Sequence, residues 1–558
     1  MRKQIVYTVV CVFLAATSFA SAMTEPRSTK QHREFRNDVL AYVNNCAGNI
    51  LDNLPLPSAT RFNEHWDRQY AHAYWYITIT LFDQGQLLGQ GTATTDKIAQ
   101  TLCQATRLAL TNAGITAATK VKYKALRVII TFSYPPDNYY SFISYQGNAY
   151  ELMGGRIPLR LFETNQLKQQ IAASQRYLMH VMNPQFYGFY KVYQAKSDQD
   201  STLLRTIYSA SSLYSFIKLY RYNHDQALEK NFRKIAGFLL SMQVKNGKNA
   251  GGFYYAYNIK TDKKTCKLVA GTASKTIFTL LELYEFYHDE VYLNAAQKAG
   301  DWLLTMVQSD GSVWPEAICV GDQWHYVKKQ SFLYSGQVLS ALSRLAAVTH
   351  AKRYYQGASL IAGRINEQVR QQNYFVGDDF RAPNTVSTSW VAMSLTDYAR
   401  INHAPWVRDT IKQAVDQVLA RQINNPHDVY NYGRYLDTMT TSGNGWINEV
   451  FTELYRVCLR DPIGDCNRLR EAVIKTSRWL LQNAYTEINA YALKNPANAI
   501  GGFIRNYVNP TVRTDAVCHG VNSLVNLAEI TGSNNETIIL PEQRFEETIG
   551  LLRIGKGL

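Results

Sequence analysis

From about Leu203 onward, one repeating pattern constrains the fold more than any other feature of the chain. Each unit is a very apolar helix, a turn, a more amphipathic helix, and a loop rich in glycine and aromatic residues. Residues 277–287 leave almost no polar face, which predicts a buried helix. Residues 292–306 place apolar side chains along one stripe, which predicts a helix with one wet face. The apolar helices begin near Arg205, Gly271, Gly336, Ser389, Trp446 and His519.

Six alternations of buried and half-exposed helices predict an inner ring inside an outer ring, an (α/α)6 toroid. In such a ring, each loop after an outer helix leads into the N-terminus of the next inner helix. These loops therefore open at one end, where we expect any functional cleft. The outer helices are expected at residues 232–243, 292–308, 354–371, 407–422, 469–482 and 542–554.

The residues before the repeat predict a small, separate α+β domain. Residues 74–82 are rich in β-branched and aromatic side chains and indicate a strand, and residues 125–134 indicate a second. A helix at 95–112, a hairpin at 141–153 and a closing helix at 167–181 complete an element order that resembles the AMMECR-type α+β domain. The chain is too long for one core, so we expect a multidomain protein. Its expected parts are an N-terminal α+β domain at 23–185 and an all-α toroid at 190–558.

The first 22 residues are typical of a signal peptide. A basic start at Arg2 and Lys3 is followed by an apolar run and then by Ala20-Ser21-Ala22, a small-residue cleavage pattern. No later stretch reaches about 18 apolar residues, so we expect no integral membrane segment after cleavage. The expected location is therefore outside the cytoplasm, either periplasmic or secreted.

The cysteines agree with an oxidising compartment. Cys458 and Cys466 flank a turn-rich loop and are a candidate disulfide, and Cys266 with Cys319 is a second candidate. The spacings include no Cys-x-x-Cys, and there is no His-Glu-x-x-His. We therefore predict no metal site and no cofactor.

The formal net charge of +15 favours an anionic partner. Acidic polysaccharides, anionic membrane surfaces and nucleic acids all fit this charge, but Lys and Arg are scattered without a basic run, so nucleic acid is not expected. The chain also has 38 tyrosines, whose rings can stack on sugars or pack between helices. A glycan or another cell-envelope polymer is the expected partner.

Three short motifs resemble those of the six-hairpin glycosidase-like toroids, including glucuronyl C5-epimerase-like and N-acyl-sugar epimerase-like proteins. They are Tyr334-Ser335-Gly336-Gln337, Trp314-Pro315-Glu316, and Val512-Arg513-Thr514-Asp515 followed by His519. The resemblance spans about residues 203–535 and implies a toroid that processes sugars. Such folds host hydrolases, lyases, epimerases and non-catalytic relatives, so the reaction is left open.

Individual candidates have a chemical and a structural interpretation. Glu316 beside Trp314 could act as a general acid if desolvated, or it could be a solvated loop carboxylate. Asp515 with Arg513 and His519 could orient a substrate or act as a base, or Asp515 could cap a helix.

The remaining candidates are weighed in the same way. Glu449 beside Trp446 could face the cleft or cap its helix. Tyr432 and Arg434 could supply acid/base chemistry and a carboxylate clamp, or pack on the surface. The predicted catalytic residues are Glu316, Tyr432, Glu449, Asp515 and His519. The predicted substrate-binding residues are Tyr254, Trp314, Tyr334, Gln337, Trp390, Arg434, Trp446 and Arg513.

Together these features predict an exported carbohydrate-active protein that acts on an acidic or aminated polysaccharide as a hydrolase, lyase or epimerase. The alternative is a non-catalytic glycan-binding, cell-envelope-binding or scaffold protein. Two titratable groups facing each other across the cleft would favour an enzyme. Stacked aromatic side chains without such a pair would favour a binding protein.

Overall fold

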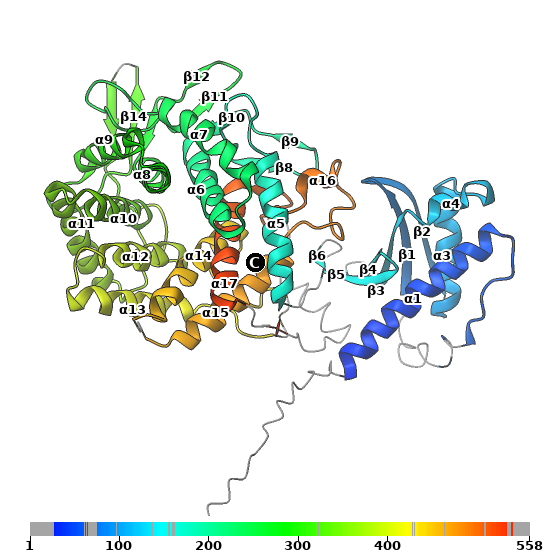
Figure 1. The fold of residues 1–558 in the computed structure, drawn as a ribbon. Coiled ribbons are helices and arrows are strands. Elements are labelled where there is room, and N and C mark those ends of the chain that lie inside the picture. The colour runs from blue at the N-terminus through cyan, green and yellow to red at the C-terminus, as the bar shows by residue number, and fades with distance from the viewer. Residues whose placement is uncertain are drawn as a thin grey trace, which may run out of the picture.

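The structure is a computed structural model (Figure 1). The expected signal peptide at 1–22 and the expected helix at 542–554 lie outside the residues that it describes. It describes residues 27–538, apart from 61, 63, 65–74, 96, 135–137, 154–156, 159–161, 322, 427, 429, 462–463, 507–508 and 533–536.

Twelve helices form two concentric rings, which confirms the predicted (α/α)6 toroid. Each inner helix packs against the next, and the last packs against the first. The inner helices are α6 (Thr206–Asn223), α8 (Ala270–Tyr287), α10 (Phe332–Thr349), α12 (Thr385–Tyr398), α14 (Thr441–Cys458) and α17 (Thr514–Thr531). The outer helices are α5 (Thr164–His180), α7 (Gln226–Ser241), α9 (Glu290–Met306), α11 (Lys352–Gln371), α13 (Pro405–Leu419) and α15 (Cys466–Gln482).

Helix α5 corrects one part of the sequence-based assignment. We expected this helix to close the N-terminal domain, but it packs against α17 and α6 as the twelfth ring helix. Leu167 and Leu178 belong to the apolar core of the ring. Gln170 and Ser174 donate hydrogen bonds to the carbonyl of Gly501, at 3.1 and 2.8 Å. An amphipathic stripe predicts a buried face but does not identify the core that buries it.

The N-terminal part is an antiparallel sheet covered on one face by α1 (Arg27–Leu51) and α3 (Ile98–Asn112). A disulfide between Cys46 and Cys103 joins these two helices. The strand order is β2-β1-β3-β4-β5-β6. The strands are β1 (Trp75–Asp83), β2 (Gln86–Thr95), β3 (Arg127–Tyr134), β4 (Asn138–Tyr145), β5 (Asn148–Met153) and β6 (Ile157–Pro158).

Strand β2 was not expected from the sequence. Its residues Gly89 and Gly91 face α3, and a Cβ on either would lie 2.5 or 2.3 Å from a helix carbonyl oxygen. The glycines let the helix approach the strand closely, but they remove the β-branched and aromatic signal of a strand.

The opposite face of the sheet contacts the ring through the loop after α15. Ile129, Ile143 and Leu152 of the sheet pack with Ile488 and Tyr491 of that loop. The N-terminal part is therefore seated against the ring by an apolar contact.

Short strands form a rim where the inner helices begin. The rim consists of three small sheets that lead directly into α6, α8 and α17, where we had expected loops. The sheets are β10 (Leu203–Arg205) with β11 (Ala256–Asn258) and β12 (Lys263–Lys264); β13 (Lys267–Val269) with β14 (Glu316–Val320) and β15 (Gln323–Tyr326); and β16 (Val512–Arg513) with β8 (Val192–Gln194) and β9 (Gln199–Asp200).

Two further disulfides lie in the ring, and Cys518 is a buried free thiol. Cys266 is bonded to Cys319 at the rim, and Cys458 is bonded to Cys466 at the opposite end. Within the described residues, no helix is both long and apolar enough to span a bilayer. The remaining short elements are η2 (Ala117–Thr119), α4 (Lys120–Tyr123), α16 (Pro496–Ala499), and β7 (Phe162–Glu163) paired with β17 (Thr537–Ile538).

Candidate functional site

The inner helices enclose a cavity of about 270 Å³ at the end where they begin, which we call the site cavity. All six contribute side chains from their first two turns, because residues three or four apart share one face of a helix. Tyr255 and Arg381 are added by loops of the rim end. The polar and aromatic side chains from the inner helices are Tyr208, Ser211, Thr272, Lys275, Tyr334, Gln337, Trp390, Ser442, Trp446, Asp515 and His519.

A buried histidine–carboxylate pair forms one wall of the site cavity. Nδ1 of His519 on α17 lies 2.6 Å from Oε2 of Glu449 on α14, and Nδ2 of Asn522 donates to Oε1 of Glu449 at 2.9 Å. Burial acts to raise the pKa of Glu449, but the hydrogen bond from His519 and the nearby positive charges lower it to about 2. Ionised Glu449 can only accept, so Nδ1 carries a proton, and in the neutral imidazole Nε2 is the nitrogen that keeps its lone pair.

A second ion pair lies beside it. Arg513 donates from Nε and Nη2 to the two carboxylate oxygens of Asp515, at 2.9 and 2.5 Å, and from Nη2 to the hydroxyl of Tyr208 at 3.1 Å. Ser442 donates to Oδ2 of Asp515 at 3.1 Å. Burial acts to raise the pKa of Asp515, but Arg513 outweighs it and the pKa is lowered. Asp515 is the only carboxylate residue among the described residues that line the site cavity.

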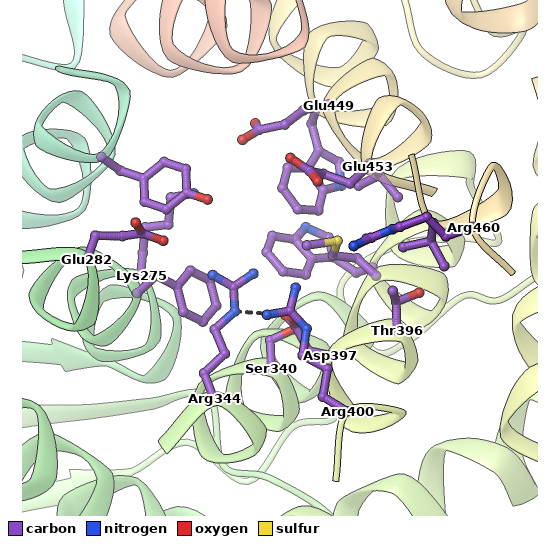
Figure 2. A pocket seen from close by; sticks show the side chains of 17 residues that line it. Lys275, Glu282, Ser340, Arg344, Thr396, Asp397, Arg400, Glu449, Glu453 and Arg460 are labelled. Atoms are coloured by element: carbon purple, nitrogen blue, oxygen red, sulfur yellow. Dashed lines mark hydrogen bonds and ion pairs between the residues drawn. The ribbon is translucent and has the colours of Figure 1, made fainter. Parts of the chain in front are cut away.

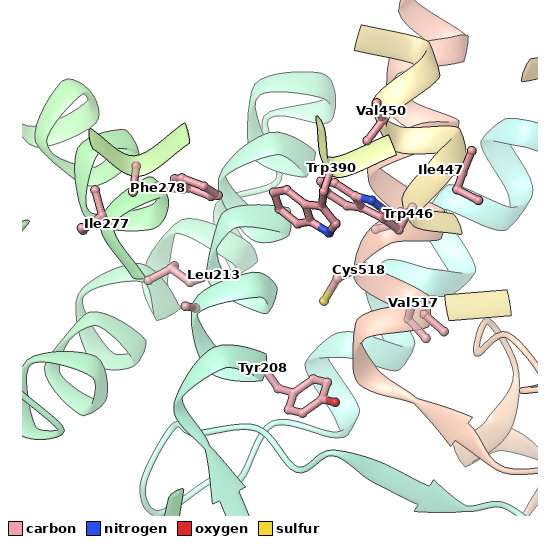
Figure 3. Packing of buried hydrophobic residues seen from close by; sticks show 14 of the residues in the cluster. Tyr208, Leu213, Ile277, Phe278, Trp390, Trp446, Ile447, Val450, Val517 and Cys518 are labelled. Atoms are coloured by element: carbon pink, nitrogen blue, oxygen red, sulfur yellow. The ribbon is translucent and has the colours of Figure 1, made fainter. Parts of the chain in front are cut away.

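Two stacked tryptophans form a floor across the ring axis (Figure 3). The rings of Trp390 and Trp446 lie 3.9 Å apart at 15°, and Nε1 of Trp446 donates to Ser389 at 3.0 Å. The His519 ring meets Trp446 edge-on at 5.2 Å. Both tryptophans and Lys275 also line a second cavity of about 130 Å³ beyond the floor (Figure 2).

The side chains of the second cavity are strongly charged. Arg344 donates to Asp397 at 2.9 Å, and Glu453 accepts from Lys218 at 3.0 Å. Ion pairs between inner helices therefore surround it, one from α10 to α12 and one from α6 to α14.

The site cavity brings together seven of the thirteen predicted residues, and an eighth, Glu449, supports His519 from behind while lining the second cavity. These residues come from different repeats, and the ring places them at one end as expected. The seven are Tyr334, Gln337, Trp390, Trp446, Arg513, Asp515 and His519.

Three predicted residues of the rim do not line the site cavity, and the expectation of one shared cleft is wrong for them. Glu316 lies on β14 and accepts from Lys267 at 2.6 Å. Trp314 packs against Tyr326 with ring centroids 5.4 Å apart. Tyr254 contributes only its carbonyl to the start of α6, while the adjacent Tyr255 lines the cavity. Successive residues of an extended segment point in opposite directions, so a loop motif does not predict which one faces inward.

Tyr432 and Arg434 also lie outside the site cavity, which corrects their predicted roles. Nε of Arg434 donates to Asn431 at 2.7 Å, and its Nη1 donates to the carbonyl of Tyr435 at 2.9 Å. Arg434 is 4% exposed and holds its own loop together. The carbonyl of Tyr432 accepts from Arg478 at 3.0 Å. Both residues are buried, whereas the structural interpretation had placed their packing on the surface.

Several lining residues were missed in the sequence. Tyr208, Thr272 and Lys275 lie in the first two turns of inner helices, at the same depth as the predicted residues. Lys275 is a charged residue among the small residues that begin α8, and this was the signal that could have identified this wall. Arg381 comes from an irregular loop and had no comparable signal.

The described residues contain no group of three or more His, Cys, Asp or Glu side chains arranged to hold a metal ion.

Comparisons with known proteins identify the fold. No family model matches the chain, and no curated protein matches it. Solved structures do match, among them cellobiose 2-epimerase from Bacillus thermoamylovorans B4167, with a TM-score of 0.52 and 10% identity over 66% of this chain and 99% of that one. This chain has the six-hairpin toroid fold.

Two other solved structures show the same likeness. A D-mannose isomerase matches with a TM-score of 0.51 and 12% identity, over 66% of this chain and 98% of that one. A sugar epimerase from a ruminal bacterium matches with a TM-score of 0.51 and 9% identity, over 66% of this chain and 99% of that one. At these identities the toroid likeness is one of fold, and function is argued from the cavity.

Proposed function

We propose that the ring is a sugar-processing enzyme that moves a proton at a sugar carbon, as an epimerase, isomerase or lyase does. The observation that carries the proposal is the His519–Glu449 pair at the wall of a closed-ring cavity. A histidine oriented by a buried carboxylate is a recurring general base. The names of the similar structures, two epimerases and an isomerase, support the same class.

The geometry supports a defined division of roles. Nε2 of His519 would take a proton from a carbon next to a carbonyl or carboxyl group, and the C–H electron pair would become the double bond of an enolate. Arg513 would stabilise negative charge on the substrate oxygen. Burial, followed by the charge of Glu316, raises the pKa of Tyr334 to about 12, so its hydroxyl stays protonated and can donate.

Hydrolysis by a carboxylate pair fits the cavity less well. Most glycosidases place two carboxyl groups roughly 5–10 Å apart across the scissile bond. Among the described residues that line the site cavity, Asp515 carries the single carboxylate. Its oxygens already accept hydrogen bonds from Arg513 and Ser442. Proton transfer at His519 therefore agrees better with the side chains present.

The rim supports an acidic polymer as the substrate. Lysines lie over aromatic rings around the mouth, which presents flat apolar faces together with positive charge. An acidic sugar chain offers ring faces and carboxylates that match both. The pairs are Lys264 over Tyr254, Lys248 over Tyr326, and Lys328 over Trp314, while Lys267 over Tyr255 is itself paired with Glu316. Export belongs to the same proposal and is supported by the apolar N-terminal run and by three disulfides.

The test is deuterium exchange. The protein is incubated in D2O with oligosaccharides of uronic acids and, separately, of neutral sugars, and the recovered sugars are examined by mass spectrometry and NMR. We expect deuterium at carbon or an unsaturated product with the uronic acids. His519→Gln should lower the rate at least about 100-fold, whereas His403→Gln, on an exposed loop outside the cavity, should leave it unchanged.

Two outcomes would contradict the proposal. Release of reducing ends without deuterium at carbon would show a hydrolase. Tight binding without any product would support the alternative of a glycan-binding protein.

A further inference from the structure

Lys275 is a buried cation that the proposed proton transfer does not use. Its side chain is 7% exposed and lines both cavities, where it faces the rings of Tyr214 and Phe278 at 4.8 and 5.6 Å. Within the described part of the chain it makes no hydrogen bond and no ion pair. Burial lowers the pKa of Lys275, and an anionic ligand at its ammonium would offset the cost of burying the charge.

The charged groups near Lys275 already have other partners. Both oxygens of Glu449 are taken by His519 and Asn522. Arg344 is paired with Asp397, and Lys218 with Glu453. On the side of the site cavity, Asp515 is neutralised by Arg513. The ammonium of Lys275 is therefore left without a hydrogen-bonded counter-charge from these neighbours, although ionised Glu449 attracts it at longer range.

Two more buried polar groups lie at the same wall. Within the described residues, Thr272 Oγ1 and Gln337 Oε1 have no hydrogen-bond partner, and both side chains line the site cavity. Thr272 lies one turn before Lys275 on α8. Gln337 on α10 reaches the start of α8 because Gly271 has no side chain. A Cβ on Gly271 would lie 2.0 Å from Oε1 of Gln337. Both oxygens are buried, Oε1 against Gly271, so this wall combines polar side chains with the ammonium of Lys275.

We propose that Lys275, Thr272 and Gln337 form a subsite for an anionic substituent of the sugar, in the first instance the carboxylate of a uronic acid. The ammonium and the threonine hydroxyl donate to the carboxylate, and the amide NH2 of Gln337, whose oxygen lies against Gly271, donates to a neighbouring sugar oxygen. The proposal rests on the proposed function in placing a sugar in the site cavity. It adds the residues that select the acidic sugar.

Binding is measured by calorimetry with three probes: glucuronate, glucose and glucose 6-sulfate. We expect wild type to bind glucuronate at least about 10-fold more tightly than glucose, the range of a hydrogen bond to a charged group. Lys275→Met keeps the length of the side chain, and it should remove this preference while leaving glucose binding in place. The affinity for glucose 6-sulfate shows whether the subsite binds carboxylates alone or anions in general.

Stability provides a second readout. Lys275→Met removes the cost of a buried ammonium but also a charge that helps to keep Glu449 ionised, so its melting temperature should stay close to that of wild type. Lys352→Met, the same change on exposed α11, should alter neither binding nor stability. Thr272→Val keeps the shape of the side chain and should weaken glucuronate binding severalfold, and it provides the test if Lys275→Met does not fold.

The failures of the two proposals are distinguishable. His519→Gln should still bind glucuronate in a Lys275-dependent way, since binding does not require proton transfer. If no sugar is turned over but this binding persists, the reaction is wrong and the subsite stands. Equal affinity of wild type for glucuronate and glucose, or an unchanged preference in both Lys275→Met and Thr272→Val, would overturn the subsite.

Discussion

The hydrogen bond between His519 and Glu449 joins α17 to α14 in a nearly dry environment, with side-chain exposures of 15% and 9%. The pair orients the imidazole, and it also connects the last inner helix of the ring to its neighbour. The ionisation of the Glu449 carboxylate depends on this hydrogen bond, which the folded ring provides.

Glu449→Gln tests this link through pH. The pKa of Glu449 falls from 4.5 to about 2 in the folded chain, so ionised Glu449 stabilises the fold above about pH 4.5 and this stabilisation is lost as the pH falls toward 2. In denaturant unfolding, wild type should exceed the variant by on the order of 3 kcal/mol near neutral pH. The difference should shrink below about pH 4.5.

Glu367→Gln, on the exposed face of α11, is the matched control and should show little difference at any pH. A stability difference for Glu449→Gln that stays constant from neutral pH to about pH 2 would contradict the linkage.

Residues on helices were predicted better than residues on loops, for a geometric reason. Trp390, Trp446 and His519 occupy corresponding positions on inner helices, and the 3.6-residue period determines which side each one faces. Glu316 and Arg434 lie on extended or irregular segments, where one residue of offset reverses the direction of a side chain. Their partners, a lysine on another strand and carbonyls of their own loop, leave no pattern in the sequence.

At the scale of elements, the rim strands hold the cavity mouth in place. β13 leads directly into α8, and the disulfide from Cys266 to Cys319 ties it to β14. The other ring disulfide, between Cys458 and Cys466, joins α14 to α15 at the far end of the ring. The two bonds therefore allow a comparison of the mouth with the opposite end.

Replacing both cysteines of each disulfide with serines should separate the effect on stability from the effect on binding at the mouth. The disulfides have sequence separations of 53 and 8, so their removal should cost about 4 and about 2.5 kcal/mol of unfolding free energy, respectively. Denaturant unfolding measures these losses. Only the Cys266/Cys319 variant should also weaken binding of an acidic polymer, and equal binding by both variants would argue against the rim as a binding surface.

The helical hairpins were the part of the fold that the sequence predicted best, because six apolar helices of similar length leave few alternatives. Strand β2 was missed because its glycines, needed for contact with α3, lower its strand propensity. α5 was recognised as a helix but assigned to the wrong core. Assigning α5 correctly requires knowing that α17 and α6 have an apolar face that no other helix covers. That becomes visible only when the ring is assembled.

At the scale of the whole molecule, α5 and α17 meet although more than half of the chain separates them. Ser174 of α5 donates to the carbonyl of Gly501, in the loop before α17, and the apolar faces of the two helices share one core. The ring is closed by this contact.

A truncation series tests ring closure. A chain that begins at residue 190, the expected domain boundary, lacks α5 and leaves the buried face of α17 exposed to water. It should lose cooperative thermal unfolding and bind a hydrophobic dye, whereas a chain that begins at Phe162 should keep a cooperative transition by circular dichroism. If both chains unfold alike, α5 is not required for the ring.

The order of the helices in the chain also sets the order in which they are synthesised. During synthesis, five inner helices leave the ribosome before α17, which carries both Asp515 and His519. A nascent or prematurely ended chain can therefore build most of the wall and the tryptophan floor, but it lacks the proposed base and the closing contact with α5. The site cavity is complete only after the last inner helix has folded back to the first outer one, so the proposed proton transfer should begin only once α17 has been made.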